Sequence, residues 1–166
     1  YQHQEPRLIV IHQENAGVAS ARNAALKIAS GDYVCFIDGD DYIHPDLLMS
    51  LDSMLSDHPE LDLLAYDDLL TTPLRFAHAE FPSLPTISDL KIHSSDTKQE
   101  FQHILYHAPY SVCCAVFRTA IAKQISFIPL CIGEDILWGK QFAYLTNNMA
   151  KWRARPYYYF QRPSSF

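Results

Sequence analysis

The sequence Tyr33-Val34-Cys35-Phe36-Ile37-Asp38-Gly39-Asp40-Asp41, residues 33–41, carries the strongest signal for the fold. Its first five residues are apolar without alternation, which is typical of a central strand covered on both faces. Asp and Gly then turn the chain, and open α/β sheets bind ligands beyond the carboxyl ends of their strands. The segment therefore predicts a buried strand that ends at a ligand site.

Asp38, Asp40 and Asp41 place three carboxylates within four positions, where they repel one another unless a cation joins them. Carboxylate oxygens suit Mg²⁺ or Mn²⁺, and such ions are commonly held by one or two carboxylates together with substrate phosphates. The alternative is structural, since Asp is also favoured in turns and at helix N-termini. An EF-hand is excluded, because its sixth and twelfth positions would be Ile43 and Met49 instead of Gly and Glu.

Strand and helix patterns alternate around this segment. Residues 8–11 are an apolar, β-branched run that predicts a strand, and residues 18–28 carry apolar side chains at helical spacing. A second amphipathic pattern covers residues 47–55, and residues 61–66 read as another strand. This order predicts an α/β fold with a mostly parallel central sheet flanked by helices. The expected buried face of the first helix comprises Val18, Ala21, Ala25 and Ile28.

Residues 67–110 are less regular and are interrupted by prolines, with one short helix expected near residues 97–106. We expect a single partial domain in which residues 1–66 form an α/β part, residues 67–110 a variable excursion and residues 111–166 a second part. Within that second part, a strand over 112–117, a short helix over 119–123 and a last aromatic strand over 156–160 are predicted. A further helix begins at Glu134, with Ile136, Phe142 and Leu145 as its apolar side.

Composition narrows the function classes. The chain has 166 residues, of which 48% are hydrophobic, as expected for one globular domain. Thirteen basic and nineteen acidic residues give a net charge of −6 without a basic stripe, which argues against nucleic acid as a partner. No apolar run approaches the roughly 18–20 residues of a membrane span. The four cysteines form no CxxC pair, which favours reduced thiols in a cytosolic protein.

Two more segments carry polar side chains suited to chemistry. A loop containing Gly17 leads into a helix that carries Arg22 and Asn23, and the planar fork of an arginine suits phosphate or a nucleotide base. Glu134 and Asp135 begin a later helix, where an ionised carboxylate can act as a general base. Each has an ordinary structural explanation as well, as a surface arginine and as acidic residues favoured by the helix dipole.

Taken together, these segments resemble the inverting glycosyltransferases of family 2, which have the nucleotide-sugar-binding α/β fold called GT-A. Residues 14–48, ENAGVASARNAALKIASGDYVCFIDGDDYIHPDLL, match the family pattern N-x-G-x-x-x-A-R-N and then A-x-G-x-Y-x-x-F-x-D-x-D-D-x-x-x-P at every position. The segment AVFRTAIAKQISFIPLCIGEDILW, residues 115–138, resembles the family's acceptor-side block with its Glu-Asp motif. The tail YYYFQRPSSF resembles its closing region, so the resemblance covers the chain except about residues 67–108.

The resemblance implies roles for individual residues. Asp38 is expected near the ribose or diphosphate of the donor. Asp40 and Asp41 are the expected metal residues: Asp40 would bind Mg²⁺ or Mn²⁺, and Asp41 would be its neighbour or lie in the second coordination shell. Arg22 is expected near the base and pyrophosphate, with Gly17 and Asn23 in the same nucleotide-sugar-binding segment. Asp135 is the expected general base, and Glu134 beside it serves the acceptor or orientation.

The resemblance also implies partners and a place in the cell. The donor is expected to be a nucleotide-diphosphate sugar, with UDP-sugars favoured, and the acceptor a glycan or a lipid-linked glycan. The expected setting is bacterial polysaccharide biosynthesis in the cytoplasm, at the inner face of the membrane, with peripheral membrane association and a homodimer left open.

One departure from the family pattern concerns the start of the chain. The family begins with a strand, a helix and a second strand that ends in an acidic residue reading the base, and nothing here corresponds to them. We therefore expect the base-binding half of the site to be absent. The alternative function is a non-catalytic or truncated module that binds a nucleotide or glycan weakly without turnover.

Overall fold

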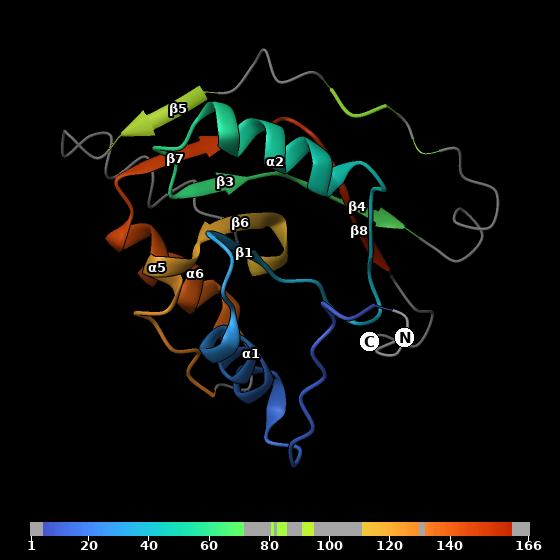
Figure 1. Ribbon diagram of the computed structural model, residues 1–166, viewed down its shortest axis with the longest axis vertical. Coiled ribbons are helices and arrows are strands. Elements are labelled where there is room, and N and C mark those ends of the chain that lie inside the picture. Colours follow the sequence, from blue (N-terminus) through green and yellow to red (C-terminus); the bar gives the residue numbers. More distant parts are fainter. Residues whose placement is uncertain are drawn as a thin grey trace.

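The computed structural model describes residues 5–71, 81, 83–85, 91–94, 111–129 and 132–160, and all structural statements refer to these. Within them, five strands form one sheet in the order β1-β6-β3-β7-β5. In that spatial order the strands are Tyr33–Cys35, Ala115–Arg118, Leu63–Ala65, Asn148–Lys151 and Lys91–Ser94. Figure 1 shows helices on both sides of this sheet.

The expectation of a mostly parallel sheet is wrong for the described strands. Within this five-stranded sheet only β3 and β7 pair in parallel, whereas β1–β6, β6–β3 and β7–β5 are antiparallel. The cause is β6, which comes from the second half of the chain and lies between β1 and β3. β1 and β3 still run in the same direction, as the strand–helix–strand order predicts, but they are not neighbours. β1 therefore ends the strand order, and its three side chains are half-buried instead of fully covered.

A second, smaller sheet follows the acidic turn. It joins β2 (Tyr42–Ile43), β8 (Tyr157–Phe160) and β4 (Asp68–Thr71) in the order β2-β8-β4. β8 pairs antiparallel with β2 and parallel with β4. The last described strand of the chain is thereby fixed next to the residues that follow Asp41.

Four α-helices are described: α1 (Gly17–Ile28), α2 (Leu47–Asp57), α5 (Thr119–Ala122) and α6 (Glu134–Leu145). A 3₁₀ turn, η2 (Val112–Cys114), precedes β6. In Figure 1, α2 crosses the sheet on one side, while α1, α5 and α6 gather on the other. None of these helices is both long and apolar enough to cross a membrane.

The part of the core that lies between the sheet and α6 is dominated by aromatic rings, while Leu47, Leu51 and Met54 of α2 also belong to the core. Phe117 of β6 meets Trp138 at 5.0 Å and Phe142 at 4.9 Å between ring centroids. Phe127 stacks on Trp138 at 4.8 Å, and Phe36, the residue after β1, packs edge-on against both rings. Aromatic pairs of this kind stabilise beyond their area of burial. Because Phe36 stands two residues before Asp38, the core directly supports the start of the acidic turn.

The helices form where the periodicity predicts them, but two buried faces differ from the prediction. In α1 the buried apolar residues are Ala19 and Leu26, whereas Val18 and Ile28 are 46% and 48% exposed. In α6 the buried apolar residues are Trp138, Gly139, Phe142 and Ala143, while Ile136 and Leu145 lie outside. For α1 the reason is chemical: its inward face also carries Arg22 and Asn23, so a search for apolar spacing selects the opposite side.

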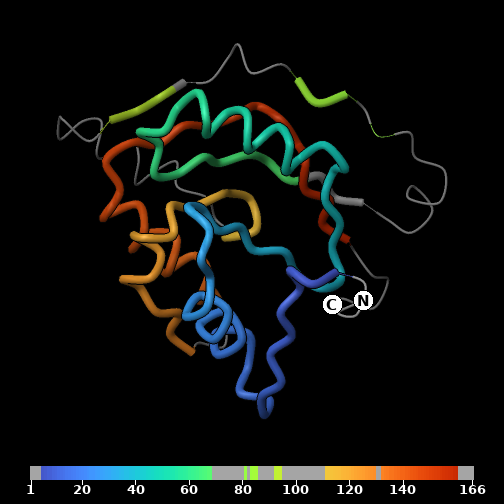
Figure 2. The backbone as a smooth tube through the Cα atoms, in the orientation of Figure 1, coloured from blue at the N-terminus to red at the C-terminus, as the bar shows by residue number. Residues whose placement is uncertain are grey.

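The strand predicted at residues 8–11 is absent, and these residues form an extended stretch before α1 (Figure 2). Their side chains are 40% to 65% exposed. A strand requires a hydrogen-bonded neighbour, and among the described residues none pairs with this segment.

Residues 67–110 contribute more regular structure than expected. Their described parts include β4, which extends the small sheet, and β5, which ends the large one. The helix predicted near residues 97–106 lies outside the described residues. β7 was not predicted, because its sequence Asn148-Met149-Ala150-Lys151 lacks the β-branched residues typical of strands.

Candidate active site

The acidic turn begins directly after β1 and Phe36 and is closed by its own backbone. The Asp41 amide donates to the Asp38 carbonyl oxygen at 3.1 Å. Asp40 at the tip is exposed, and the Asp38 side chain is 40% exposed. The turn therefore presents two carboxylates to the surface.

Asp41 faces the other way, toward β8. Its Oδ1 accepts the Phe160 amide at 2.9 Å, and its Oδ2 accepts the hydroxyl of Tyr157. The same Tyr157 oxygen accepts the Asp38 amide at 3.2 Å. Both oxygens of Asp41 thus bind β8, and the turn is attached to this strand at three points.

Tyr157 is buried, and its pKa is raised by that burial and by the neighbouring Asp41 carboxylate. The phenol therefore stays protonated and can donate to Asp41. Cys113 lies against the same hydroxyl, and burial with the nearby Asp38 charge raises the pKa of its thiol to about 11.

Arg22 connects the acidic turn to the start of α6. Its Nη2 donates to Asp38 Oδ1, and its Nη1 donates to Glu134 Oε1, both at 3.0 Å. The arginine side chain is only 11% exposed and that of Glu134 12%. Burial disfavours the charged guanidinium, but the contacts with Asp38 and Glu134 outweigh it and raise the pKa of Arg22. The planar fork of arginine allows one side chain to hold two acids at once.

Asn23 attaches α1 to the segment that leads toward α6. Its Nδ2 donates to the Phe127 carbonyl at 2.9 Å, and its Oδ1 accepts the Phe127 amide at 2.8 Å. The guanidinium of Arg22 lies over the ring of the same Phe127, 5.5 Å from its centroid. The position of Arg22 is therefore supported by the next residue of its helix.

Gly17 begins α1 with a left-handed backbone, φ 81°, and its amide donates to Asn15 Oδ1 at 3.1 Å. A side chain at that φ would be strained. Among the described contacts, none joins Gly17 to the acidic turn.

Glu134 and Asp135 occupy the first turn of α6, after Gly133 with φ 86°. Glu134 is turned inward to Arg22, whereas Asp135 Oδ1 accepts the amide of the next residue, Ile136, at 2.9 Å. Asp135 is half-buried at the surface of the molecule. The two neighbouring acids therefore have different environments: one is bound to an arginine, and one is accessible.

The carboxylates of the acidic turn can hold a divalent cation only if a bound ligand supplies further oxygen atoms. No group of three His, Cys, Asp or Glu side chains in the described chain is arranged to hold a metal. Asp41 is engaged with β8, which leaves Asp40 and the outer face of Asp38 as carboxylates directed to the surface. Mg²⁺ commonly binds through one or two carboxylates and completes its shell with water and phosphate oxygens.

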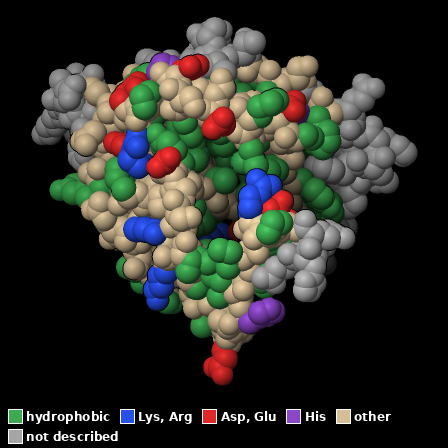
Figure 3. Space-filling model, viewed as in Figure 1, with side chains coloured by type: hydrophobic (Ala, Val, Ile, Leu, Met, Phe, Trp, Pro, Cys, Tyr) green, Lys and Arg blue, Asp and Glu red, His purple; other side chains and the backbone are tan. Residues whose placement is uncertain are grey.

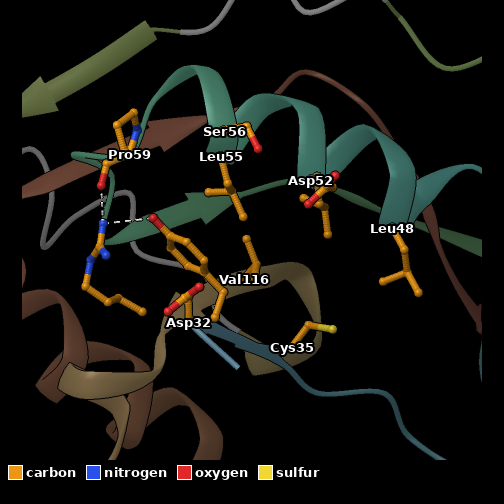
Figure 4. A pocket seen from close by; sticks show the side chains of 11 residues that line it. Asp32, Cys35, Leu48, Asp52, Leu55, Ser56, Pro59 and Val116 are labelled. Atoms are coloured by element: carbon orange, nitrogen blue, oxygen red, sulfur yellow. Dashed lines mark hydrogen bonds between the residues drawn. The ribbon is translucent and has the colours of Figure 1, made fainter. Parts of the chain in front are cut away.

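A cavity of about 470 Å³ lies elsewhere, between α2 and the strands β1 and β6 (Figure 4). Tyr33, Cys35 and Val116 line it from the sheet, with Leu48 and Leu55 from α2. Arg118 at its edge donates to the Tyr33 hydroxyl at 2.8 Å and to the Pro59 carbonyl. None of the acids of the turn lines this cavity.

Sequence reasoning missed Tyr157, Phe160 and Phe127 as supports of the site. The run Tyr157-Tyr158-Tyr159-Phe160 was recognised as an aromatic strand, but four similar residues in succession do not reveal which one faces Asp41. The pairing Ile43↔Tyr157 decides it, and that contact is not local in sequence.

Comparison with known proteins identifies the family. A family model described as "Glycosyl transferase family 2" matches residues 1–125. The chain belongs to glycosyltransferase family 2. The expected class, an α/β fold of the GT-A type, is confirmed by similarity to the crystal structure of S. aureus TarS 1-349 in complex with UDP-GlcNAc. That match has a TM-score of 0.65 and 25% identity and covers 93% of this chain and 42% of the TarS chain.

Two curated relatives of this family member come from Bacillus subtilis (strain 168). The minor teichoic acid biosynthesis protein GgaB is 33% identical over 134 residues, which is 77% of this chain and 13% of GgaB. The uncharacterized glycosyltransferase EpsJ is 45% identical over 51 residues, covering 31% of this chain and 15% of EpsJ. The chain thus spans less than a fifth of either relative and about two fifths of TarS 1-349.

Proposed function

We propose that this chain is the core of an enzyme that transfers a sugar from a nucleotide-diphosphate sugar to an acceptor hydroxyl with inversion. One observation carries the proposal: Arg22 joins Asp38 of the acidic turn to Glu134, the neighbour of Asp135. Two acidic segments 96 residues apart in sequence (134 − 38) are thereby held together. A purely structural acidic turn would not require the second segment.

The donor side is assigned to the turn. We propose that Asp38 approaches the ribose or diphosphate, while Arg22, held by two acids, contributes positive charge beside it. Gly17 and Asn23 shape the helix that carries Arg22. Asp40 would hold Mg²⁺ or Mn²⁺ together with phosphate oxygens, and Asp41 would anchor the turn instead of binding the ion. A bound cation would supply charge stabilisation for the nucleoside diphosphate leaving group.

The acceptor side is assigned to the start of α6. Asp135 would accept the proton of the acceptor hydroxyl. At the same time the oxygen of that hydroxyl would bond to the anomeric carbon of the sugar, and the bond between that carbon and the diphosphate would break. This single displacement inverts the configuration. Glu134 would orient the site through Arg22, since its carboxylate already binds that residue.

The wider assignments rest on the relatives. The TarS complex contains UDP-GlcNAc, which supports a UDP-sugar as donor, and the name of GgaB supports a bacterial cell-surface glycan or its lipid-linked form as acceptor. A cytoplasmic location at the membrane face agrees with such acceptors, and a homodimer remains compatible with them. Figure 3 shows acidic and basic side chains interspersed on one face, which gives no support to nucleic acid as a partner.

The domain organisation is also part of the proposal. Residues 1–66 would supply the donor and metal side, residues 67–110 the variable part and residues 111–166 the acceptor side of one partial catalytic domain. The insertion of β6 between β1 and β3 supports a single unit, since the two outer parts share one sheet.

The test is sugar transfer from UDP-sugars in the presence of Mn²⁺, with Asp135→Asn as the decisive variant. Loss of a general base is expected to lower the rate by about a hundredfold or more. Asp57→Asn, an equally conservative change at an exposed carboxylate of α2, serves as the control. Full activity of Asp135→Asn would refute the assignment of the base. Binding of Mn²⁺ and UDP without transfer to any acceptor would favour the alternative, a module without turnover.

A further inference from the structure

The hydroxyl of Tyr157 touches both ends of the acidic turn. It accepts the Asp38 amide at 3.2 Å and donates to Asp41 Oδ2. Since Tyr157 is 1% exposed, it cannot itself contact a substrate. Its effect on the site can only pass through the turn.

The chemistry of a phenol makes this arrangement directional. A neutral tyrosine hydroxyl has one proton to donate and lone pairs that accept. The carboxylate of Asp41 can only accept, so the phenol of Tyr157 is the donor in their hydrogen bond. That proton points to the Asp41 carboxylate, so the Asp38 amide meets a lone pair.

The backbone of Tyr157 is held between two neighbouring strands. Tyr157 is paired with Ile43 of β2 on one side and with Asp68 of β4 on the other. The Phe160 amide, three residues further along β8, binds the second oxygen of Asp41 at 2.9 Å. The turn is therefore attached to a strand that is fixed on both sides.

We propose that Tyr157 is a positioning residue of this glycosyltransferase, which orders the backbone of the acidic turn so that Asp40 faces outward to a cation and a diphosphate. Asp41 then acts as the attachment point of the turn and not as a ligand. The ordering role concerns the free protein; only the identity of the ligand rests on the proposed function.

The first experiment measures hydrogen exchange of the Asp38 and Asp41 amides by NMR in the free chain. Tyr157→Phe keeps the ring and removes only the hydroxyl, and exchange at these amides is expected to accelerate about tenfold. Tyr33→Phe is the matched control, because its hydroxyl also donates to a carbonyl, Leu61 O at 2.8 Å, and accepts from an arginine, Arg118. Equal exchange in the two variants would overturn the proposal.

Asp41→Asn tests the same hydrogen bond from the other side if Tyr157→Phe does not fold. It leaves the aromatic ring in the core and removes the ionised acceptor. Faster exchange of the Asp38 amide is expected here too, and unchanged exchange would contradict the positioning role.

The second experiment measures binding of Mn²⁺ with UDP, by the electron paramagnetic resonance signal of free Mn²⁺. Tyr157→Phe is expected to weaken binding about tenfold, and adding Asp41→Asn should cause little further loss because both changes break one coupled unit. Additive losses, or no loss, would contradict the proposal. If the wild-type chain does not bind Mn²⁺ with UDP, the proposed donor site fails, and amide exchange alone decides the role of Tyr157.

Discussion

Two arginine–aspartate pairs lie in the described part of the chain, and they differ in how much of each carboxylate remains accessible to solvent. Asp62 is 8% exposed; its Oδ1 accepts Arg118 Nε at 2.8 Å, and its Oδ2 accepts the amides of Asn147 at 2.9 Å and Asn148 at 3.3 Å. Asp38 also binds an arginine, Arg22, at 3.0 Å, but its side chain remains 40% exposed. The first carboxylate is fully used by the protein, and the second keeps an outer face.

The arginines differ in the same way. Arg118 directs its other hydrogen bonds to the Tyr33 hydroxyl and to backbone carbonyls, so it connects β6 to the end of α2 and the start of β3. Arg22 directs its second contact to another carboxylate, Glu134. An ion pair that uses up its acceptors stabilises the fold, whereas one that joins two acids and leaves one of them, Asp38, open to solvent is suited to a ligand.

The largest expected effect on stability is at the pair of Arg118 and Asp62. Asp62→Ala leaves Arg118 without its partner and two backbone amides without an acceptor, so we expect the free energy of unfolding to fall by about 3 kcal/mol. Urea denaturation measures it. Asp67→Ala is the control. It removes an ion pair with Lys151 in which the Asp67 side chain is 44% exposed and the Lys151 side chain 43%, so stability should change by less than about 1 kcal/mol. Similar losses in both variants would contradict the distinction between the pairs.

A smaller effect on stability is expected at the pair of Arg22 and Asp38. Arg22→Lys keeps the charge but cannot reach Asp38 and Glu134 together, so a loss of about 2 kcal/mol is expected, with weaker Mn²⁺–UDP binding. The matched control is Arg7→Lys, where the arginine is 88% exposed and pairs with the nearby Glu5. Unchanged stability and binding in Arg22→Lys would show that the fork is not required.

The last effect is absent at neutral pH and concerns Cys113, which lies near the pair of Arg22 and Asp38. Burial raises the pKa of Cys113 from 9.0 to about 11, so the folded state binds the thiol proton more tightly than the unfolded state does. Its contribution is complete below pH 9 and is lost as the pH rises to 11, by about 1 kcal/mol per pH unit. Urea denaturation between pH 8 and pH 11 should therefore show a shallower decline for Cys113→Ala. If stability declined equally steeply in both proteins, groups other than Cys113 would cause the loss of stability at alkaline pH.

The sequence allowed those parts of the fold to be predicted that depend on neighbours along the chain. β1, α2 and α6 follow from apolar runs and helical spacing within a dozen residues. The position of β6 between β1 and β3 could not be predicted, because antiparallel insertion depends on contacts far apart in sequence. The partial failure for α1 has another cause, since polar residues that serve the site occupy its inner face.

The candidate site could also be predicted only in part from the sequence. Motif spacing brought attention to Asp38, Arg22 and Glu134, and the structure holds these three side chains together. Motif spacing could not separate the roles of Asp40 and Asp41, because neighbours in sequence point in opposite directions across a turn. Their environments differ through β8 alone.

The attachment of the acidic turn to β8 has a consequence for the order of synthesis. The hydrogen bonds from Asp38 to Tyr157 and from Phe160 to Asp41 each span 119 residues. A ribosome adds about 5–20 residues per second, so the turn waits roughly 6–24 seconds before its supporting strand is made. Throughout that interval Asp41 lacks its partners Tyr157 and Phe160, and the acidic turn is not attached to β8. Completion of the acidic turn therefore has to wait until β8 has been synthesised.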